Sequence, residues 1–230
     1  MSTTRHLSCP VLGSETQPYS LILLNTAFIE PVYALLRPLS RYSLAADGAA
    51  NHLHRLIQTQ PELPGPTHIV GDLDSVDKEA IAFFAGTEVR EIPSQDWNDL
   101  QKCLEVAGQL PDVGKVYIVA SMYGRVDHTL AIFSSLFDPQ YQGLEMVLVD
   151  QRNISLPVFP GNTQIDLSES WTRCGLIPIE RSVVTTTGLQ WNVHQQVMEL
   201  GGLVSSSNQA TARQVTITSS GKLLWTASVA

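Results

Sequence analysis

Aspartates recur in this sequence directly after apolar runs that are typical of buried strands. Asp72 and Asp74 flank a single leucine just after the run at residues 68–70, and Asp47 follows the run at residues 43–46. The carboxyl ends of parallel strands meet at one edge of a sheet, where open α/β sheets bind their ligands. We therefore expect these carboxylates to gather in one crevice. Further polar residues at later strand ends, or at the start of the helix that follows, are Asp96, Asp99, Arg125 and Asp127.

Crowded carboxylates indicate a site for a hard cation. Carboxylates held close together repel one another and raise one another's pKa, and a bound cation removes that cost. Mg²⁺ prefers oxygen ligands and commonly shares them with substrate phosphates. The sequence therefore indicates a magnesium site that faces a phosphate-bearing ligand. The chain has no GxxxxGK[ST] loop, so a nucleotide would be held by another arrangement.

Each of these residues also fits a purely structural role. The aspartate pair after residue 70 could be turn residues or helix N-caps. Asp96 could cap a helix whose first turn contains Asp99, and Arg125 could form a surface ion pair with Asp127. His128, next in the chain, is expected to start a helix or to pack. Only the joint placement of the acidic residues at strand ends favours a functional interpretation.

The order of apolar and helical segments predicts two domains. Up to about residue 143, continuous apolar runs alternate with helical segments, of which residues 94–110 have the clearest one-sided apolar pattern. This alternation is typical of an α/β domain with a mostly parallel sheet. From Leu144 onward, short β-rich runs are separated by glycine, asparagine, serine and proline, which is typical of an all-β sandwich or small barrel. We expect an α/β domain at residues 1–143 and a β-sandwich domain at residues 144–230.

Composition argues against several classes of protein. The 230 residues are 43% hydrophobic, and 14 Lys and Arg against 22 Asp and Glu give a net charge of 14 − 22 = −8. An acidic chain is a poor candidate for binding nucleic-acid phosphates. Three widely spaced cysteines without a CxxC pair fit a reducing compartment. No apolar run approaches the roughly 20 residues that cross a bilayer, and the first residues lack the apolar core of a signal peptide. We expect a soluble, cytoplasmic protein that binds neither nucleic acid nor membrane.

Seven short motifs occur in order from about residue 45 towards the C-terminus. They are ADGAAN, GDLDS, DWNDLQKCL, GRVDHTL, CGLIPI, TTTGLQWN and LVSSSN. Together, across both expected domains, they resemble the motifs of the thiamine pyrophosphokinase family. The resemblance implies transfer of a pyrophosphoryl group from ATP to the hydroxyethyl group of thiamine, giving thiamine diphosphate and AMP. It also implies an ATP- and Mg²⁺-binding α/β domain, a thiamine-binding β sandwich, and a homodimer with active sites between the two chains.

The resemblance assigns roles to individual residues of the first domain. The carboxylates that match those holding Mg²⁺ and the triphosphate are Asp47, Asp72, Asp74 and Asp99. Asp96 and Asn98 fall in the same motif on the ATP side, although Asn98 stands where the family frequently has threonine. Arg125 and Asp127 match a pair near the nucleotide and the reacting alcohol. Arg125 could steady charge that develops on the phosphates, and either Asp99 or Asp127 could accept the proton of the alcohol.

The resemblance also assigns residues of the second domain to thiamine. Ser207 and Asn208 match its thiamine-binding end, and Trp191 matches an aromatic residue that stacks on the thiamine pyrimidine from the partner chain. Tryptophan suits this role because thiamine has a cationic thiazolium and a flat aminopyrimidine. Alternatively, Trp191 could be a core residue of the β domain. Trp171 and Trp225 are expected to pack.

Two other functions stay open at the level of sequence. The DLD segment at residues 72–74 also fits the metal motif of a glycosyltransferase that uses a nucleotide sugar. The β-rich second half and the SSSN segment count against that function. A non-catalytic thiamine or nucleotide sensor would be expected to lose the acidic cluster, which is intact here.

Overall fold

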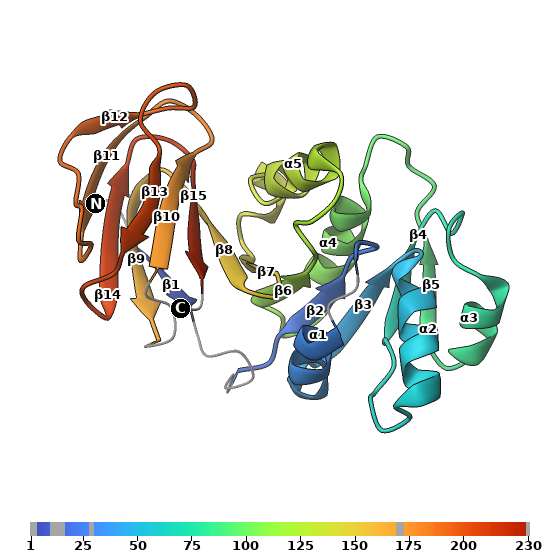
Figure 1. Ribbon diagram of the computed structural model, residues 1–230. Helices are drawn as coiled ribbons and strands as arrows, with labels where there is room; N and C mark the ends of the chain where they lie inside the picture. The colour runs from blue at the N-terminus through green and yellow to red at the C-terminus, as the bar shows by residue number, and fades with distance from the viewer. Residues whose placement is uncertain (1–3, 10–16, 28–29, 169–172, 229–230) are drawn as a thin grey trace. The chain divides into compact units, whose positions relative to one another are not determined.

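The computed structural model describes residues 4–9, 17–27, 30–168 and 173–228 (Figure 1). In this part of the chain the residues form two compact units. The α/β unit contains the described residues between 15 and 151, and the β unit contains those of 1–14 and 152–230. The predicted combination of an α/β domain and an all-β domain is therefore confirmed. Trp171 lies outside the described residues.

Six parallel strands form the sheet of the α/β unit, in the order β7-β6-β2-β3-β4-β5. They are β2 (Ser20–Leu23), β3 (Tyr42–Ala46), β4 (His68–Gly71), β5 (Glu88–Glu91), β6 (Lys115–Val119) and β7 (Glu145–Val149). The chain runs outward from β2 to β5 and then returns to β6 on the other side of β2. The strand order reverses between β2 and β6, and open α/β sheets bind ligands in the crevice at such a point.

Within the described residues of this unit, five α-helices connect these strands and cover the sheet. They are α1 (Glu30–Leu36), α2 (Ala49–Thr59), α3 (Lys78–Phe83), α4 (Asp99–Gln109) and α5 (Val126–Ser135), with the short 3-10 helices η1 (Arg37–Leu39) and η2 (Pro139–Tyr141). Right-handed crossovers place α1, α2 and α3 on one face and α4 and α5 on the other, and Figure 1 shows α1 and α5 on opposite sides of the strands. Leu21, Ile22 and Leu44 are fully buried, as continuous apolar runs predict for strands covered on both faces.

Asn98, and not Asp96, caps the N-terminus of α4. Asn98 Oδ1 accepts a hydrogen bond from the Gln101 N–H at 3.0 Å, and Gln101 Oε1 accepts one from the Asn98 N–H at 3.2 Å. This reciprocal capping box satisfies two backbone donors at once. The predicted apolar face of the helix packs on β3 and β4. Cap and face together fix the position of Asp99, the first helical residue.

The β unit contains two sheets that are mostly antiparallel. Their orders are β1-β9-β14-β11-β12 and β13-β10-β15-β8. The strands are β1 (Arg5–Cys9), β8 (Asn153–Val158), β9 (Gly161–Leu167), β10 (Arg173–Pro178), β11 (Ser182–Thr187), β12 (Gln196–Met198), β13 (Ser205–Gln209), β14 (Gln214–Ser219) and β15 (Leu223–Ser228). Trp225 of β15 is fully buried, which confirms its predicted packing role. The strand-rich unit is consistent with the predicted sandwich.

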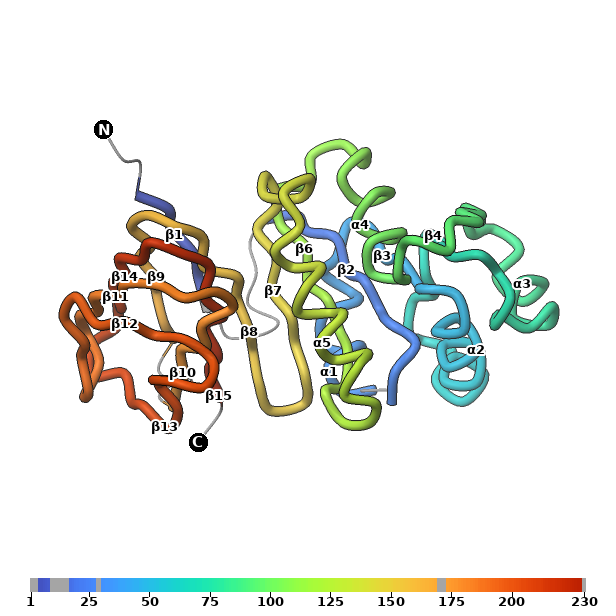
Figure 2. Tube along the Cα trace, turned by 90° about the horizontal axis from the view of Figure 1, so that it is seen from above, coloured from blue at the N-terminus to red at the C-terminus, as the bar shows by residue number. Residues whose placement is uncertain are grey.

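The structure divides the chain at different residues from those that the sequence predicted. β7 pairs in parallel with β6 over its whole length, so it belongs to the α/β sheet although it lies after residue 143. β1 pairs in parallel with β9, and Figure 2 shows the two strands side by side. A short apolar run does not reveal which sheet it joins, because the partner strand is distant in the sequence. Among the described residues, no helix is long and apolar enough to cross a membrane.

Candidate active site

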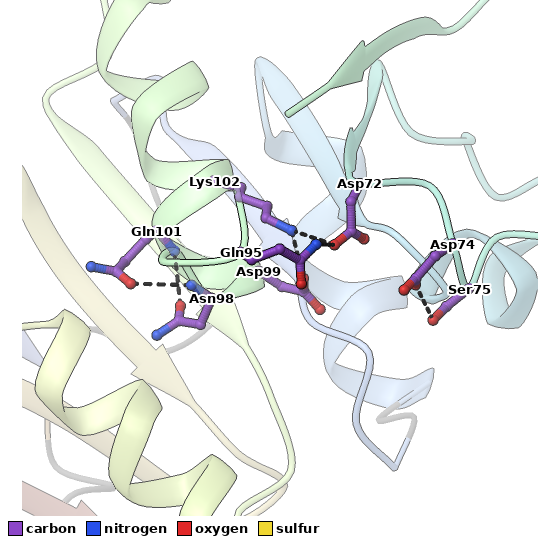
Figure 3. Close-up of polar contacts among 8 residues, drawn as sticks. All are labelled: Asp72, Asp74, Ser75, Gln95, Asn98, Asp99, Gln101 and Lys102. Atoms are coloured by element: carbon purple, nitrogen blue, oxygen red, sulfur yellow. Dashed lines mark hydrogen bonds and ion pairs between the residues drawn. The ribbon is translucent and has the colours of Figure 1, made fainter. Parts of the chain in front are cut away.

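Three carboxylates from the ends of two adjacent strands meet in the α/β unit. Asp47 follows β3, and Asp72 and Asp74 follow β4, the parallel neighbour of β3. One oxygen of each carboxylate lies within 4.8 Å of an oxygen of each of the others. Figure 3 shows Asp72 and Asp74 on the loop after β4, with α4 opposite them. The structure therefore brings together three of the aspartates that the sequence selected, and we call them the three-carboxylate group.

The backbone around the three-carboxylate group is unusual at three positions. Leu73, between the two aspartates of the loop, has φ 64°, and Asp47 has φ 44°. This left-handed region costs a residue such as leucine about 1–2 kcal/mol, and strain of this kind concentrates at functional sites. At Gly71 a Cβ would lie 2.7 Å from Asp47 Cβ. Only glycine therefore lets the end of β4 pass so close to Asp47.

Asp47 is the most buried member of the group. The residue is 3% exposed, and its Oδ1 has no hydrogen-bond partner within the described part of the chain. Burial, and next the charge of Asp99, raises the pKa of Asp47 to about 6. A buried charged oxygen without a partner is costly, and a cation would remove that cost. Since carboxylates are the ligands that Mg²⁺ prefers, the three residues fit a magnesium ion.

Lys102 of α4 supplies a positive charge beside the group. Its Nζ lies 2.9 Å from Asp72 Oδ2 and 4.0 Å from Asp99 Oδ1, and only 2% of the residue is exposed. Figure 3 shows this side chain reaching from α4 to Asp72, where Gln95 Nε2 donates a second hydrogen bond at 3.2 Å. The hydrogen bond from Lys102 is the main reason that the pKa of Asp72 lies below its ordinary value.

The sequence pattern did not indicate Lys102, because a lysine in an amphipathic helix is normally solvated. The signal that could have found it is its spacing of three residues from Asp99, which puts both side chains on one side of the helix. Buried lysines are rare without a charged partner, so this position belongs to the candidate site.

Asp99, Asp96 and Asn98 take three different positions near the start of α4. Asp99 lies beside the three-carboxylate group without being one of its members, and burial raises its pKa against the opposing effect of Lys102. Asp96 is exposed and lies outside the group. The carboxamide of Asn98 caps the helix and donates to Ser135 Oγ at 2.8 Å. Its polar atoms are therefore largely used within the protein.

Two adjoining cavities lie where the strand order of the sheet reverses. One, of about 200 Å³, is lined by residues after β2, by the start of α4 and by α5. The other, of about 360 Å³, is lined by residues after β2 and β6 and by the start of α5. Asn25, Thr26, His128 and Ile132 line both cavities, and Asp99 lines the smaller one. A ligand of an open α/β sheet is expected at this place.

Arg125 and Asp127 form an exposed ion pair beside the larger cavity. Arg125 Nε donates to Asp127 Oδ1 at 3.2 Å, and Arg125 Nη2 donates to Asp127 Oδ2. These hydrogen bonds hold the pKa of Asp127 below its ordinary value. The surface ion pair that the sequence left open is thus present, while Arg125 also lines the larger cavity. His128 lies in the first turn of α5, which confirms the first of its two expected roles. It is exposed and lines both cavities, so it does not pack.

The β unit has a cavity of its own, of about 530 Å³. Its lining comes from β10, β13 and β15 and includes Trp191, Ser207 and Asn208. Trp191 is 58% exposed, so the alternative that it is a core residue is wrong. The turn that carries Trp191 requires Gly188, which has φ 85° and where a Cβ would lie 2.5 Å from Gln214 O.

Ser207 and Asn208 of β13 both line this cavity but differ in burial and hydrogen bonding. Ser207 has φ 57° and is exposed, at an irregularity in the pairing of β13 with β10. Asn208 is 4% exposed, and its carboxamide bonds to the backbone of Trp191. Of the two, only Ser207 offers a free side chain to the cavity.

Comparison with known proteins connects both units to one family. Residues 34–148 match the family model "Thiamin pyrophosphokinase, catalytic domain", and residues 162–224 match "Thiamin pyrophosphokinase, vitamin B1 binding domain". Thiamine pyrophosphokinase 3 of Oryza sativa subsp. japonica is 34% identical over 237 residues, covering 92% of this chain and 87% of that protein. Thiamin pyrophosphokinase 1 of Caenorhabditis elegans is 31% identical over 195 residues, covering 81% of this chain and 78% of that protein.

Solved structures share the fold. Thiamin pyrophosphokinase from Candida albicans has a TM-score of 0.83 at 19% identity, covering 99% of this chain and 93% of that chain. Yeast thiamin pyrophosphokinase has a TM-score of 0.82 at 16% identity, covering 98% and 91%. With these matches, the chain belongs to the thiamine pyrophosphokinase family.

Proposed function

We propose that this chain is a thiamine pyrophosphokinase that uses a divalent cation. It transfers the pyrophosphoryl group of ATP to the hydroxyethyl oxygen of thiamine, giving thiamine diphosphate and AMP. Family membership supports the choice of substrates. The observation that carries the site is the three-carboxylate group, with the buried, unpartnered oxygen of Asp47.

We assign the cation to Asp47, Asp72 and Asp74. Mg²⁺ bound there would neutralise phosphate charge. Lys102 keeps Asp72 ionised through their 2.9 Å contact. The same lysine limits the negative charge that the group accumulates in the absence of a cation.

The chain's own residues account for positioning and proton transfer. The alcohol oxygen of thiamine forms a bond to the β-phosphorus, the bond from that phosphorus to the oxygen shared with the α-phosphate breaks, and AMP leaves. Arg125 lines the larger cavity and can bind phosphate oxygens once it leaves Asp127. Each of these contributions is electrostatic or positional, as phosphoryl transfer requires.

Of the two candidate proton acceptors, the geometry favours Asp99. Burial raises the pKa of Asp99, which makes it the stronger base, and its side chain lines the smaller cavity. The pKa of Asp127 is lowered by Arg125, which makes it the weaker base. The place of Asp99 beside the three-carboxylate group, not within it, also suits a proton acceptor better than a fourth cation ligand.

We place thiamine in the cavity of the β unit. The exposed indole of Trp191 offers a flat, electron-rich face for the pyrimidine or the thiazolium, and Ser207 offers a hydroxyl. From the family resemblance we propose a homodimer whose active sites lie between the two chains. The free, buried thiols of Cys103 and Cys174 fit a reducing cytoplasm, where we place the enzyme.

The test is incubation with thiamine, ATP and Mg²⁺, followed by chromatography. We expect AMP and thiamine diphosphate, and no product in EDTA. Asp112→Asn is the matched control, because Asp112 is an exposed aspartate paired with Arg41 outside the three-carboxylate group, and it should keep wild-type turnover. Formation of ADP would mean simple phosphorylation and would reject the proposal. Turnover of a nucleotide sugar would instead support the glycosyltransferase, which the family match does not favour.

A further inference from the structure

All four hydrogen-bonding positions of the Asn208 carboxamide are occupied by other groups of the protein. Its Oδ1 accepts from the Trp191 N–H at 3.2 Å and from the Gln209 N–H at 2.9 Å. Its Nδ2 donates to Trp191 O at 2.9 Å and to Ser205 Oγ at 3.0 Å. A carboxamide has two donor hydrogens and two acceptor lone pairs. Although Asn208 borders the cavity of the β unit, it therefore has no polar position left for a ligand.

Two of these four hydrogen bonds are made to the backbone of the same residue. Asn208 holds both the N–H and the C=O of Trp191, a residue 17 positions away in the sequence. The neighbouring residue extends the contact, because the Gln190 N–H donates to Gln209 O at 2.8 Å. The peptide groups of Trp191 are thus fixed to β13, while its indole is 58% exposed.

A second asparagine closes the loop that carries Trp191 but does not hold Trp191 itself. Asn192 Oδ1 accepts from the Leu189 N–H at 3.2 Å, and its Nδ2 donates to Leu189 O at 2.8 Å. Asn192 therefore closes the turn back to Leu189 through bonds that do not involve Asn208. What Asn208 adds is the attachment of one aromatic residue to the strand that lines the cavity.

We infer that Asn208 is a positioning residue that orients the indole of Trp191 for stacking on thiamine, and that it does not bind thiamine itself. The inference rests on the proposed function, which supplies the ligand. An exposed aromatic side chain held in its binding orientation loses less conformational freedom when a flat ligand stacks on it. We call the two hydrogen bonds between the Asn208 carboxamide and the backbone of Trp191 the clamp. Loss of the clamp therefore weakens thiamine binding only through Trp191.

A double-mutant cycle tests this directly, because it separates a residue that acts through Trp191 from one that acts on its own. We compare the wild type, Asn208→Ala, Trp191→Ala and the double variant, and measure kcat and KM for thiamine and for ATP. The gain from positioning cannot exceed that of the aromatic contact, about 5- to 150-fold. We expect Asn208→Ala to raise the thiamine KM within this limit and to leave the ATP KM within about twofold. In the Trp191→Ala background it should raise the thiamine KM no further.

Other variants keep the test decisive if Asn208→Ala does not fold. Ser205→Ala removes one partner of the carboxamide and should raise the thiamine KM less, and again only when Trp191 is present. Asn162→Ala removes a half-buried carboxamide on β9 that bonds Thr4 Oγ1. It serves as the control for general destabilisation of the β unit and should leave the thiamine KM unchanged.

Two results would overturn the inference. If the effects of Asn208→Ala and Trp191→Ala multiply, Asn208 binds thiamine independently. If Asn208→Ala leaves the thiamine KM unchanged, the clamp has no functional role. Failure of the wild type to form thiamine diphosphate is a separate outcome that rejects the proposed function. In that case the mobility of the Trp191 indole is measured by fluorescence anisotropy decay, and Trp191→Phe identifies the part of the decay that comes from this indole. We expect that part to become faster in Asn208→Ala. An unchanged decay would show that Asn208 does not hold Trp191.

Discussion

Replacing Lys102 with methionine should destabilise the metal-free protein more than replacing any exposed lysine. Lys102 Nζ lies 2.9 Å from Asp72 Oδ2, and their side chains are 3% and 19% exposed. At an effective dielectric constant of about 20, the attraction at this distance is about 6 kcal/mol before desolvation is subtracted. Breaking a buried pair by removing one partner costs about 3–5 kcal/mol. Because Asp72 is partly exposed, we expect about 3 kcal/mol, which is roughly 6–12 °C in Tm for a protein of this size.

Mg²⁺ should reduce this loss. Without Lys102 the three-carboxylate group is more negative, so it should attract a divalent cation more strongly. We expect Mg²⁺ to raise the Tm of Lys102→Met by more than it raises that of the wild type, as measured by thermal unfolding in EDTA and in Mg²⁺. Lys78→Met is the control, because Lys78 is an exposed lysine of α3. A loss below about 1 kcal/mol in EDTA, or equal Mg²⁺ shifts in both proteins, would refute this reasoning.

Three further predictions concern the carboxylates and Trp191. Asp74→Asn should abolish turnover while keeping the wild-type Tm, because the exposed carboxylate of Asp74 serves the cation and not the fold; near-normal turnover at saturating Mg²⁺ would remove Asp74 from the site. In EDTA, Asp47→Asn should stabilise the protein at pH 8 by up to about 3 kcal/mol, since burial raises the pKa of Asp47 to about 6 in the folded state. Because the pKa of Asp47 is lower in the unfolded state, the folded wild type gains stability by binding a proton as the pH falls from about 6 to about 4. Urea titrations should therefore show that the stability advantage of Asp47→Asn disappears over that range. A gain in stability that does not depend on pH contradicts this assignment. Trp191→Ala should keep the wild-type Tm because the indole is exposed. Its thiamine KM should rise about 5- to 150-fold, because the stacking contact is lost. A large fall in Tm with an unchanged thiamine KM would mean that Trp191 has a structural role.

The parts of the fold that depend on local patterns could be predicted from the sequence. The continuous apolar runs at β2 and β3 indicated buried parallel strands because such strands are covered on both faces. The assignment of β7 failed because the same apolar run fits either unit, and only its pairing with β6 decides between them. The association of β1 with β9 joins residues more than 150 positions apart, and no local pattern encodes it.

The candidate site was predictable where strand ends determine it. Asp47, Asp72 and Asp74 meet because neighbouring parallel strands deliver them to one edge. Lys102 could not be selected in this way, since its burial depends on how α4 packs against the sheet. The side-chain bonds of Asn208 depend on contact between β13 and a distant loop. The sequence alone could not distinguish such a clamp from a ligand-binding residue.

The most direct test of the central claim follows the fate of the β-phosphate. Wild-type protein is incubated with thiamine, Mg²⁺ and ATP carrying a radioactive label at the β-phosphate, and the products are separated by chromatography. We predict that the label appears in thiamine diphosphate, that unlabelled AMP forms in equal amount, and that Asp72→Asn forms neither product. Label retained in ADP, or full turnover by Asp72→Asn, would contradict pyrophosphoryl transfer at the three-carboxylate group.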